Sequence, residues 1–144
     1  MIRHAGLIAL RRDGRWRGAL IEGPSGVGKS DLALRAVESG FALAADDRTV
    51  VFASGGELYG KAPDSLSGLI EIRGLGVVPT PVIAFARIAL LVRCVDAPGA
   101  IERLPQPRFE TLCGVSVPVF DLWPQEPAAP AKIRRMLEHL GVAL

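Results

Sequence analysis

The chain has 144 residues, of which 49% are apolar and 22% are charged, and its formal net charge is +2. This size and composition are typical of one globular domain and exclude disordered, collagenous and disulfide-dense proteins. The charge indicates no nucleic-acid partner, and the longest apolar run, 88–92, is far shorter than the ~20 residues of a membrane-spanning helix. We therefore expect a single cytoplasmic domain over residues 1–144, with no membrane partner.

The amino-terminal third predicts a hairpin followed by a helix. Apolar runs at 4–10 and 19–21 predict two strands, and Asp13-Gly14 between them is a strong hairpin turn. Residues 30–39 have apolar side chains at helical spacing, and Gly40 follows where a helix end favours glycine.

Further strands follow the predicted helix. The run at 41–45 predicts a short strand, 49–53 its return strand, and 58–81 a loop-rich stretch in which 69–72 is the ordered piece. Residues 88–95 predict a buried strand and 115–122 the last strand. A terminal helix is expected at 131–140. Together these elements indicate the α/β class, with a mainly β centre.

The two cysteines give no sign of a metal site or a disulfide framework. Cys94 and Cys113 lie in different segments, without a CxxC pair or a histidine cluster. We expect both to be buried small hydrophobic residues.

One octet, GPSGVGKS, carries the clearest chemical pattern in the chain. It fits GxxxxGK[ST], in which backbone N–H groups and the following helix N-terminus hold the phosphates of a nucleotide. Lys29 would reach the terminal phosphates, and Ser30 would hold Mg²⁺. The predicted nucleotide-binding residues are Gly23, Pro24, Ser25, Gly26, Val27, Gly28, Lys29 and Ser30.

Phosphoryl transfer needs a further carboxylate, and two positions compete for this role. Asp96 ends an apolar run, as in a Walker B strand, whereas Asp46 and Asp47 end another run sixteen residues after Ser30. If the strand continued, adjacent side chains would face opposite sides, so at most one of the pair would point at the octet. The other could tie down a loop, and spacing alone leaves the competition open.

The octet, the ADD triplet at 45–47 and above all LIEIRGLGVV at 69–78 closely resemble the catalytic domain of HPr kinase/phosphorylase. The resemblance runs from His4 to about Leu104. It implies a P-loop kinase domain of the phosphoenolpyruvate carboxykinase-like type that uses ATP and Mg²⁺ to phosphorylate a serine of the phosphocarrier protein HPr. It also implies the reverse reaction with inorganic phosphate, which releases pyrophosphate, and assembly as a hexamer.

The same resemblance implies roles for single residues. Ser30 and Glu71 match two magnesium ligands, and Asp47 matches the acid–base residue that faces the serine hydroxyl. His4 matches a histidine that interacts with that aspartate, and Arg103 an arginine tied to dephosphorylation. Arg73 lies between this signature's glutamate and its glycines, which predict a constrained loop at a subunit or substrate boundary. Under these assignments, Asp96 only ends a core strand.

Two departures from the family pattern bear on function. We expect the separate amino-terminal domain of longer members to be absent, as in short proteobacterial forms. Pro105 in ERLP replaces a glycine, which puts the phosphorylase direction in doubt. Two other hypotheses remain. One is a related P-loop kinase of another protein or small molecule, and the other is a non-catalytic nucleotide-binding regulator.

Overall fold

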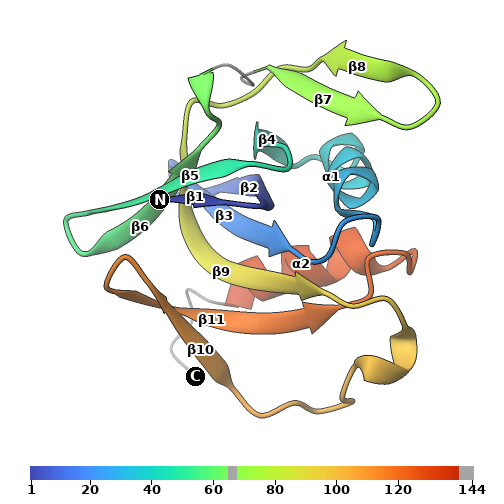
Figure 1. The fold of residues 1–144 in the computed structure, drawn as a ribbon. Helices are drawn as coiled ribbons and strands as arrows, with labels where there is room; N and C mark the ends of the chain where they lie inside the picture. Colours follow the sequence, from blue (N-terminus) through green and yellow to red (C-terminus); the bar gives the residue numbers. More distant parts are fainter. Residues whose placement is uncertain (65–67, 140–144) are drawn as a thin grey trace.

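The computed structural model describes residues 1–64 and 68–139, which form a curled mixed sheet, a separate hairpin and two α-helices (Figure 1). The helices are α1 (Lys29–Glu38), the short 3-10 helix η2 (Pro98–Ala100) and α2 (Ala129–His139). The main sheet contains β1 (Ile2–Arg3), β2 (Ala5–Arg12), β3 (Arg15–Glu22), β4 (Ala42–Ala45), β5 (Thr49–Ser54), β6 (Glu57–Lys61), β9 (Ala86–Cys94), β10 (Arg108–Leu112) and β11 (Val115–Leu122). The separate hairpin consists of β7 (Leu69–Ile72) and β8 (Gly76–Pro79).

Strand β9 is the centre of the main sheet, whose order is β1-β5-β6-β9-β3-β2-β4. On one side β9 runs parallel to β3. On its other side, the start of β9 pairs antiparallel with β6, and its last part pairs parallel with β11. Because β3 and β9 are parallel, the segments that follow them leave from the same edge of the sheet. Ligands of α/β sheets bind outside such carboxyl ends, and the octet begins there.

Both faces of the sheet are buried, which explains why its central strands read as continuous apolar runs. One face packs against α1, α2 and β7 through residues such as Leu32, Ile133 and Ile70. The other face packs against the curled outer strands of the same sheet, through Leu58 and Val117 among others. The rigid edge that carries the octet is therefore supported from both sides.

The sequence predicted most of these elements. The Asp13-Gly14 turn is confirmed, with φ of 51° and 74°, as are the helix after the octet and the strand at 115–122. The piece at 69–72 is ordered as expected, and it is a strand. The α/β class with a mainly β centre is also confirmed. Leu140, the predicted end of the last helix, lies outside the described residues.

Other expectations were wrong. Strand β5 is not the return partner of β4, since β5 pairs with β1 and β6 while β4 pairs with β2. The stretch 58–81 contains β8 and most of β6, so its described part is more ordered than its glycines and prolines indicated. Strand β10 was missed, because its sequence RFETL carries charged side chains on a partly exposed strand.

The two cysteines differ in environment. Cys94 is buried as expected, and burial raises the pKa of its thiol to about 11, while the positive charge of Lys29 acts in the opposite direction. Cys113 is exposed, which corrects the expectation that it is buried. It occupies the β10–β11 turn with φ 49°, followed by Gly114 with φ 80°.

Candidate active site

The octet forms a loop that joins β3 to α1. Gly26 and Gly28 have φ of 83° and 110°, conformations that favour glycine. Gly23 is held close to β9, because a Cβ added there would lie 2.9 Å from Cβ of Cys94. Val27 is buried and its N–H donates to the carbonyl of Pro24 at 3.2 Å. The loop therefore has a tight turn and packs closely against β9, as a phosphate loop between a strand and a helix is expected to do.

Lys29 is the first residue of α1, and its side chain turns back along the loop. Its Nζ donates to the carbonyl oxygens of Gly23 at 2.6 Å and Pro24 at 3.2 Å. The ammonium group thus lies over the loop, beside the N-terminus of a ten-residue helix, where helix dipole and lysine charge both favour an anion.

Asp46 connects two segments that lie far apart in sequence. Its Oδ1 accepts a hydrogen bond from Oγ of Ser30 at 2.9 Å, and its Oδ2 accepts one from the backbone N–H of Glu71 at 3.3 Å. Ser30 and Glu71 are the two predicted magnesium ligands, so one carboxylate brings both residues to the same place. For the aspartate of the pair that is not the acid–base residue, the sequence analysis suggested only that it could tie down a loop. Asp46 does this, because it holds the backbone of Glu71.

Asp46 also has a perturbed pKa. Burial raises the pKa of its carboxyl above the ordinary value of 3.8, against the lowering effect of the hydrogen bonds from Ser30 and Glu71. The negative charges of Asp47 and Glu71 raise the pKa further. A buried carboxyl beside other acids is the environment expected at a site that binds cations or moves protons.

Asp47 lies at the apex of a tight turn directly after β4. Its φ is 64°, and the N–H of Arg48 donates to the carbonyl of Asp46 at 2.7 Å. This three-residue turn is a strained conformation for a residue other than glycine, and such strain often accompanies function. Because β4 has already ended, the turn rather than strand alternation separates the exposed Asp47 from Asp46.

His4 lies in the bend between β1 and β2. These two strands pair with β5 and β4, the strands on either side of the Asp47 turn. Arg3 pairs with Thr49, and the buried hydroxyl of Thr49 donates to the carbonyl of Ala5 at 2.7 Å. A Cβ on Gly6 would lie 3.9 Å from the backbone nitrogen of Asp47. The two segments are thus adjacent, although no hydrogen bond within the described residues joins the exposed His4 to Asp47.

The two predicted arginines lie apart from each other. Arg73 is exposed at the tip of the β7–β8 hairpin, a tight turn as expected, with Gly74 and Gly76 at φ of 91° and 101°. Arg103 is exposed in the segment between η2 and β10, which Figure 1 shows on the opposite side of the sheet from this hairpin. The structure thus places the segment of Glu71 at the octet, but does not bring Arg73 and Arg103 together.

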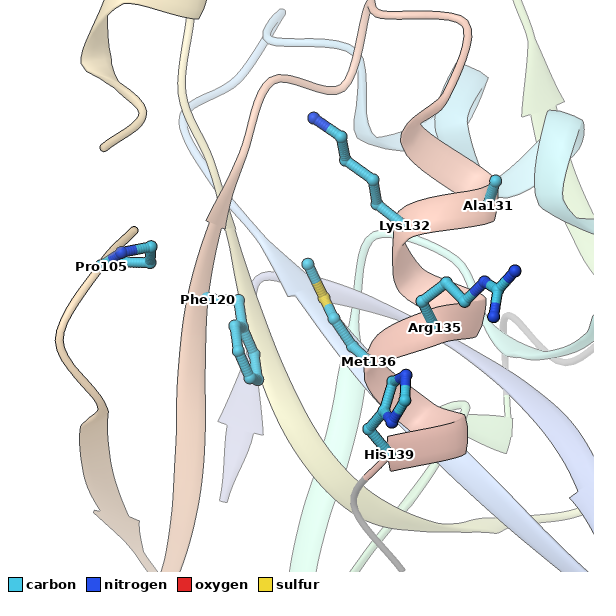
Figure 2. Close-up of a pocket in the computed structure, with 7 residues that line it drawn as sticks. All are labelled: Pro105, Phe120, Ala131, Lys132, Arg135, Met136 and His139. Atoms are coloured by element: carbon cyan, nitrogen blue, oxygen red, sulfur yellow. The ribbon is translucent and has the colours of Figure 1, made fainter. Parts of the chain in front are cut away.

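An apolar groove of about 610 Å³ lies elsewhere, between α2, β11 and the segment that holds Pro105 (Figure 2). Phe120 and Met136 face each other across it, and Arg135 and His139 border it. None of the octet residues lines this groove, so it is not the phosphate site. Pro105, the departure from the family pattern, belongs to its wall.

Neither helix among the described residues is long and apolar enough to cross a membrane.

The described residues contain no group of three or more His, Cys, Asp or Glu side chains arranged to hold a metal ion. The donor set at the octet, a serine hydroxyl and carboxylates, is nevertheless the oxygen-rich chemistry that Mg²⁺ prefers. Such sites commonly take their remaining ligands from phosphates and water.

Sequence reasoning did not identify the partners of Asp46, and it missed Thr49 and a charged network around Glu22. The contact of Asp46 with Glu71 spans 25 residues, and no local pattern encodes it. Thr49 is the one polar residue among the described buried side chains. Its burial can be recognised only when the pairing of the strands is known.

We expect Asp46→Asn to fold and to change the pH dependence of stability. The amide can still accept from the Glu71 N–H and donate to the Ser30 hydroxyl, so unfolding free energy at pH 4 should stay within about 1 kcal/mol of the wild type. Because the folded-state pKa of Asp46 is raised, its ionisation destabilises the native state as pH rises above 3.8. The variant should therefore gain stability relative to wild type between pH 4 and pH 7. Urea unfolding across this range tests the sign, and a variant that loses stability relative to wild type would contradict it.

Together, a strand, a glycine-rich phosphate loop and a helix at the carboxyl edge of a mixed sheet define a domain of the P-loop kinase fold. Residues 14–121 match the family model described as the HPr Serine kinase C-terminal domain, and the chain belongs to that family. In solved structures, the chain is similar to the Hpr(Ser) kinase/phosphatase from Coxiella burnetii, with a TM-score of 0.81 and 25% identity over 96% of this chain and 95% of that chain.

Similar curated proteins carry the same family name. The HPr kinase/phosphorylase of Streptococcus equi subsp. zooepidemicus is 37% identical over 112 residues, which cover 70% of this chain and 36% of that protein. The one from Lacticaseibacillus casei is 52% identical over 62 residues, 42% of this chain and 19% of that protein. The aligned part of this chain thus spans about a third or less of these relatives.

Proposed function

We propose that this protein is an ATP-dependent serine kinase of the phosphocarrier protein HPr, and that it can reverse the reaction with inorganic phosphate. The observation that carries the proposal is the Asp46 carboxylate, which joins Ser30 of the phosphate loop to Glu71 of the family's LIEIRG segment. Membership of the HPr Serine kinase C-terminal domain family and the similarity to proteins named HPr kinase/phosphorylase support the choice of substrate.

The phosphate loop would bind the nucleotide. Backbone N–H groups of the loop and the N-terminus of α1 would face the phosphate oxygens, and Lys29 would stabilise negative charge on the transferring group. Ser30 and Glu71 would hold Mg²⁺, which supplies further charge stabilisation when bound. In the structure, the Ser30 hydroxyl donates to Asp46 and so keeps its oxygen lone pairs available as a ligand.

Asp47 would act on the acceptor. As the serine oxygen of HPr attacks the terminal phosphorus, its proton passes to the Asp47 carboxylate, and the bond from that phosphorus to ADP breaks. In reverse, inorganic phosphate attacks phosphoserine, the serine oxygen recovers a proton from Asp47, and pyrophosphate is formed. The exposure of Asp47 at the apex of its turn is consistent with contact to a protein substrate, and His4 on the neighbouring bend would orient the Asp47 carboxylate.

Exposed apolar side chains support contacts with HPr or with other copies of the chain. Leu75 and Val77 in the β7–β8 hairpin are 76% and 64% exposed, and Leu104 beside Arg103 is 86% exposed. We propose that these two segments, with Arg73 and Arg103, face the acceptor or a neighbouring subunit, in a hexamer as the family resemblance implies.

One assay tests the proposal directly. The protein is incubated with purified HPr, Mg²⁺ and radiolabelled ATP, and inorganic phosphate is added afterwards. Label on a serine of HPr, followed by release of pyrophosphate, is the expected result. ATP binding without label on HPr would favour a kinase of another substrate or a nucleotide-binding regulator, and a kinase reaction without pyrophosphate would remove the reverse direction.

We expect Glu71→Ala to weaken the response to Mg²⁺ while the fold is kept. The hydrogen bond of this residue to Asp46 uses the backbone N–H, so removal of the exposed side chain leaves that contact in place. The Mg²⁺ concentration for half-maximal rate should rise by about ten-fold or more, the loss typical of a disturbed metal site. An unchanged Mg²⁺ titration would remove Glu71 as a ligand. Glu38→Ala, at the exposed carboxyl end of α1, is the matched control.

A further inference from the structure

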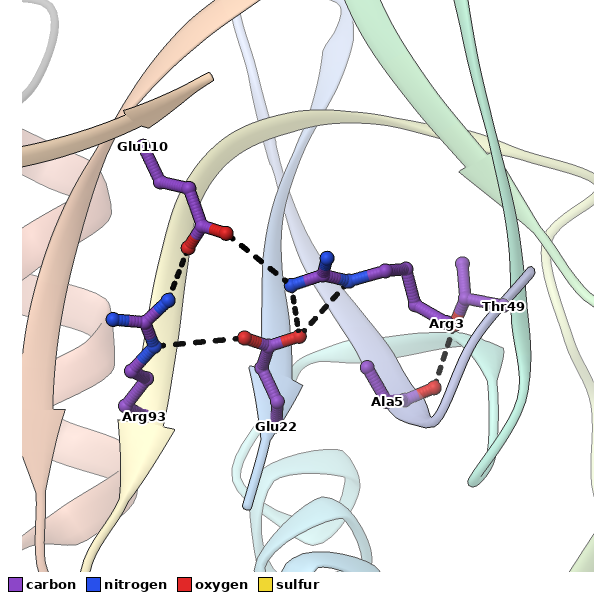
Figure 3. A network of polar contacts seen from close by, with 6 residues as sticks. All are labelled: Arg3, Ala5, Glu22, Thr49, Arg93 and Glu110. Carbon is purple, nitrogen blue, oxygen red and sulfur yellow. Dashed lines mark hydrogen bonds and ion pairs between the residues drawn. The ribbon is translucent and has the colours of Figure 1, made fainter. Parts of the chain in front are cut away.

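Four charged side chains meet at the carboxyl edge of β3 and β9 (Figure 3). Arg3 donates to Oε2 of Glu22 through Nε at 3.1 Å and Nη2 at 2.6 Å, and its Nη2 lies 3.7 Å from Oε1 of Glu110. Nε of Arg93 lies 3.6 Å from Oε1 of Glu22, and its Nη2 pairs with Glu110. Two positive and two negative charges thus form a closed ring across β1, β3, β9 and β10.

Glu22 is the best buried member of this ring. Its side chain is 17% exposed, compared with 24% for Arg3, 29% for Glu110 and 44% for Arg93. Both of its oxygens are used, one for each arginine. A partly buried network of this kind holds its members in place better than an isolated surface ion pair does.

The members of the ring lie next to segments of the proposed site. Glu22 directly precedes Gly23, the first residue of the phosphate loop, and Arg3 directly precedes His4. Arg93 directly precedes Cys94, the residue against which Gly23 packs. Both arginines that pair with Glu22 therefore lie at strand ends next to segments of the proposed site.

The structure assigns to Glu22 a positioning role: its carboxylate holds the His4 bend and the start of the phosphate loop in register, so that the acid–base group and the nucleotide meet in the correct geometry. This inference rests on the proposed function. The competing explanation is that the ring only stabilises the sheet, as cross-strand ion pairs do. The two explanations differ in what the loss of Glu22 does to the catalytic rate as opposed to stability.

The first arm of the test measures kinetics of Glu22→Gln. The amide keeps the shape but loses the charge and one acceptor oxygen, so the two arginines are no longer held equally. The kcat for HPr phosphorylation should fall by about ten- to a hundred-fold, the effect of a misplacement near 1 Å, while the KM for ATP changes less than about three-fold. Glu22→Asp, which keeps the charge, should recover part of the rate.

Glu138→Gln is the matched control. Glu138 forms an ion pair of 3.1 Å with Arg12, at the end of β2 away from His4, and undergoes the same isosteric change. It should lower stability by a similar small amount and leave kcat unchanged. Equal kinetic effects of the two variants, or an unchanged kcat in Glu22→Gln, would overturn the inference.

The second arm does not depend on activity, so it separates this inference from the proposed function. Arg3 does not contact residues 26–29 in any described hydrogen bond or ion pair, yet Arg3→Gln should shift the backbone amide NMR signals of those residues. Adding Glu22→Gln to that variant should shift them little further than Glu22→Gln alone. Unshifted loop signals in Arg3→Gln, or fully additive shifts, would overturn the positioning role even if the wild type phosphorylates HPr. A wild type that fails to phosphorylate HPr contradicts the proposed function alone, and this second arm then decides the positioning role.

Discussion

Asp47→Asn should leave nucleotide binding intact and abolish phosphorylation of HPr, with a fall in kcat of ~10²–10⁴, the contribution of a general base. The phosphate loop lies on other elements, so the dissociation constant for ATP should change little. Asparagine suits the test because it adopts the left-handed conformation, φ 64° here, at least as readily as aspartate. A loss of rate can then be attributed to the missing carboxylate rather than to a collapsed turn.

The chain offers a matched control for this substitution. Asp13 is also an aspartate at positive φ, 51°, at the tip of the β2–β3 hairpin and exposed to solvent. Asp13→Asn should fold, bind ATP and phosphorylate HPr as the wild type does. Single-turnover rates with labelled ATP and calorimetric titration of a non-hydrolysable analogue measure the two quantities. A full rate in Asp47→Asn would exclude this residue as the base and leave Asp46 as the nearest candidate.

The choice between Asp46 and Asp47 marks the limit of what the sequence could predict at this site. The octet and the helix after it follow from local chemistry, since glycine, lysine and serine at fixed spacing have few structural uses. Which of two adjacent carboxylates contacts Ser30 depends on a turn with φ 64° and on the backbone of Glu71. Both features arise from tertiary structure.

The same distinction holds for the fold. The Asp13-Gly14 turn and the helix after the octet were predicted correctly because their cues lie within a few residues. The pairing of β5 with β1 and β6 was not, because an alternating strand fits several neighbours and the neighbour is selected by burial on both faces. The ring around Glu22 lay beyond prediction for the same reason, since its four members come from four strands.

Lys29→Met should have the second large effect, on both nucleotide affinity and rate. Nζ of Lys29 is bound to the carbonyl oxygens of Gly23 and Pro24, so it is already fixed over the loop where phosphate oxygens are expected. Removing this charge should weaken ATP binding by about ten-fold or more and reduce kcat by ~10²–10³, as for the loss of one preorganised electrostatic contact. The loop should also lose stability, by about 1–3 kcal/mol, because a charged donor to two carbonyls is missing.

Lys61→Met is the control for this substitution. Lys61 is an exposed lysine at the end of β6, its Nζ lies 6.0 Å from the ring centre of Phe52, and no described hydrogen bond or ion pair joins it to the octet. It should leave affinity and rate unchanged. Calorimetry with ATP and the HPr assay separate the two effects of Lys29→Met, and Asp47→Asn provides the contrast, since it should affect rate only. If Lys29→Met retained both affinity and rate, the octet could not be the phosphate-binding loop. The Asp46–Ser30 contact would then be only a helix-end interaction in the fold.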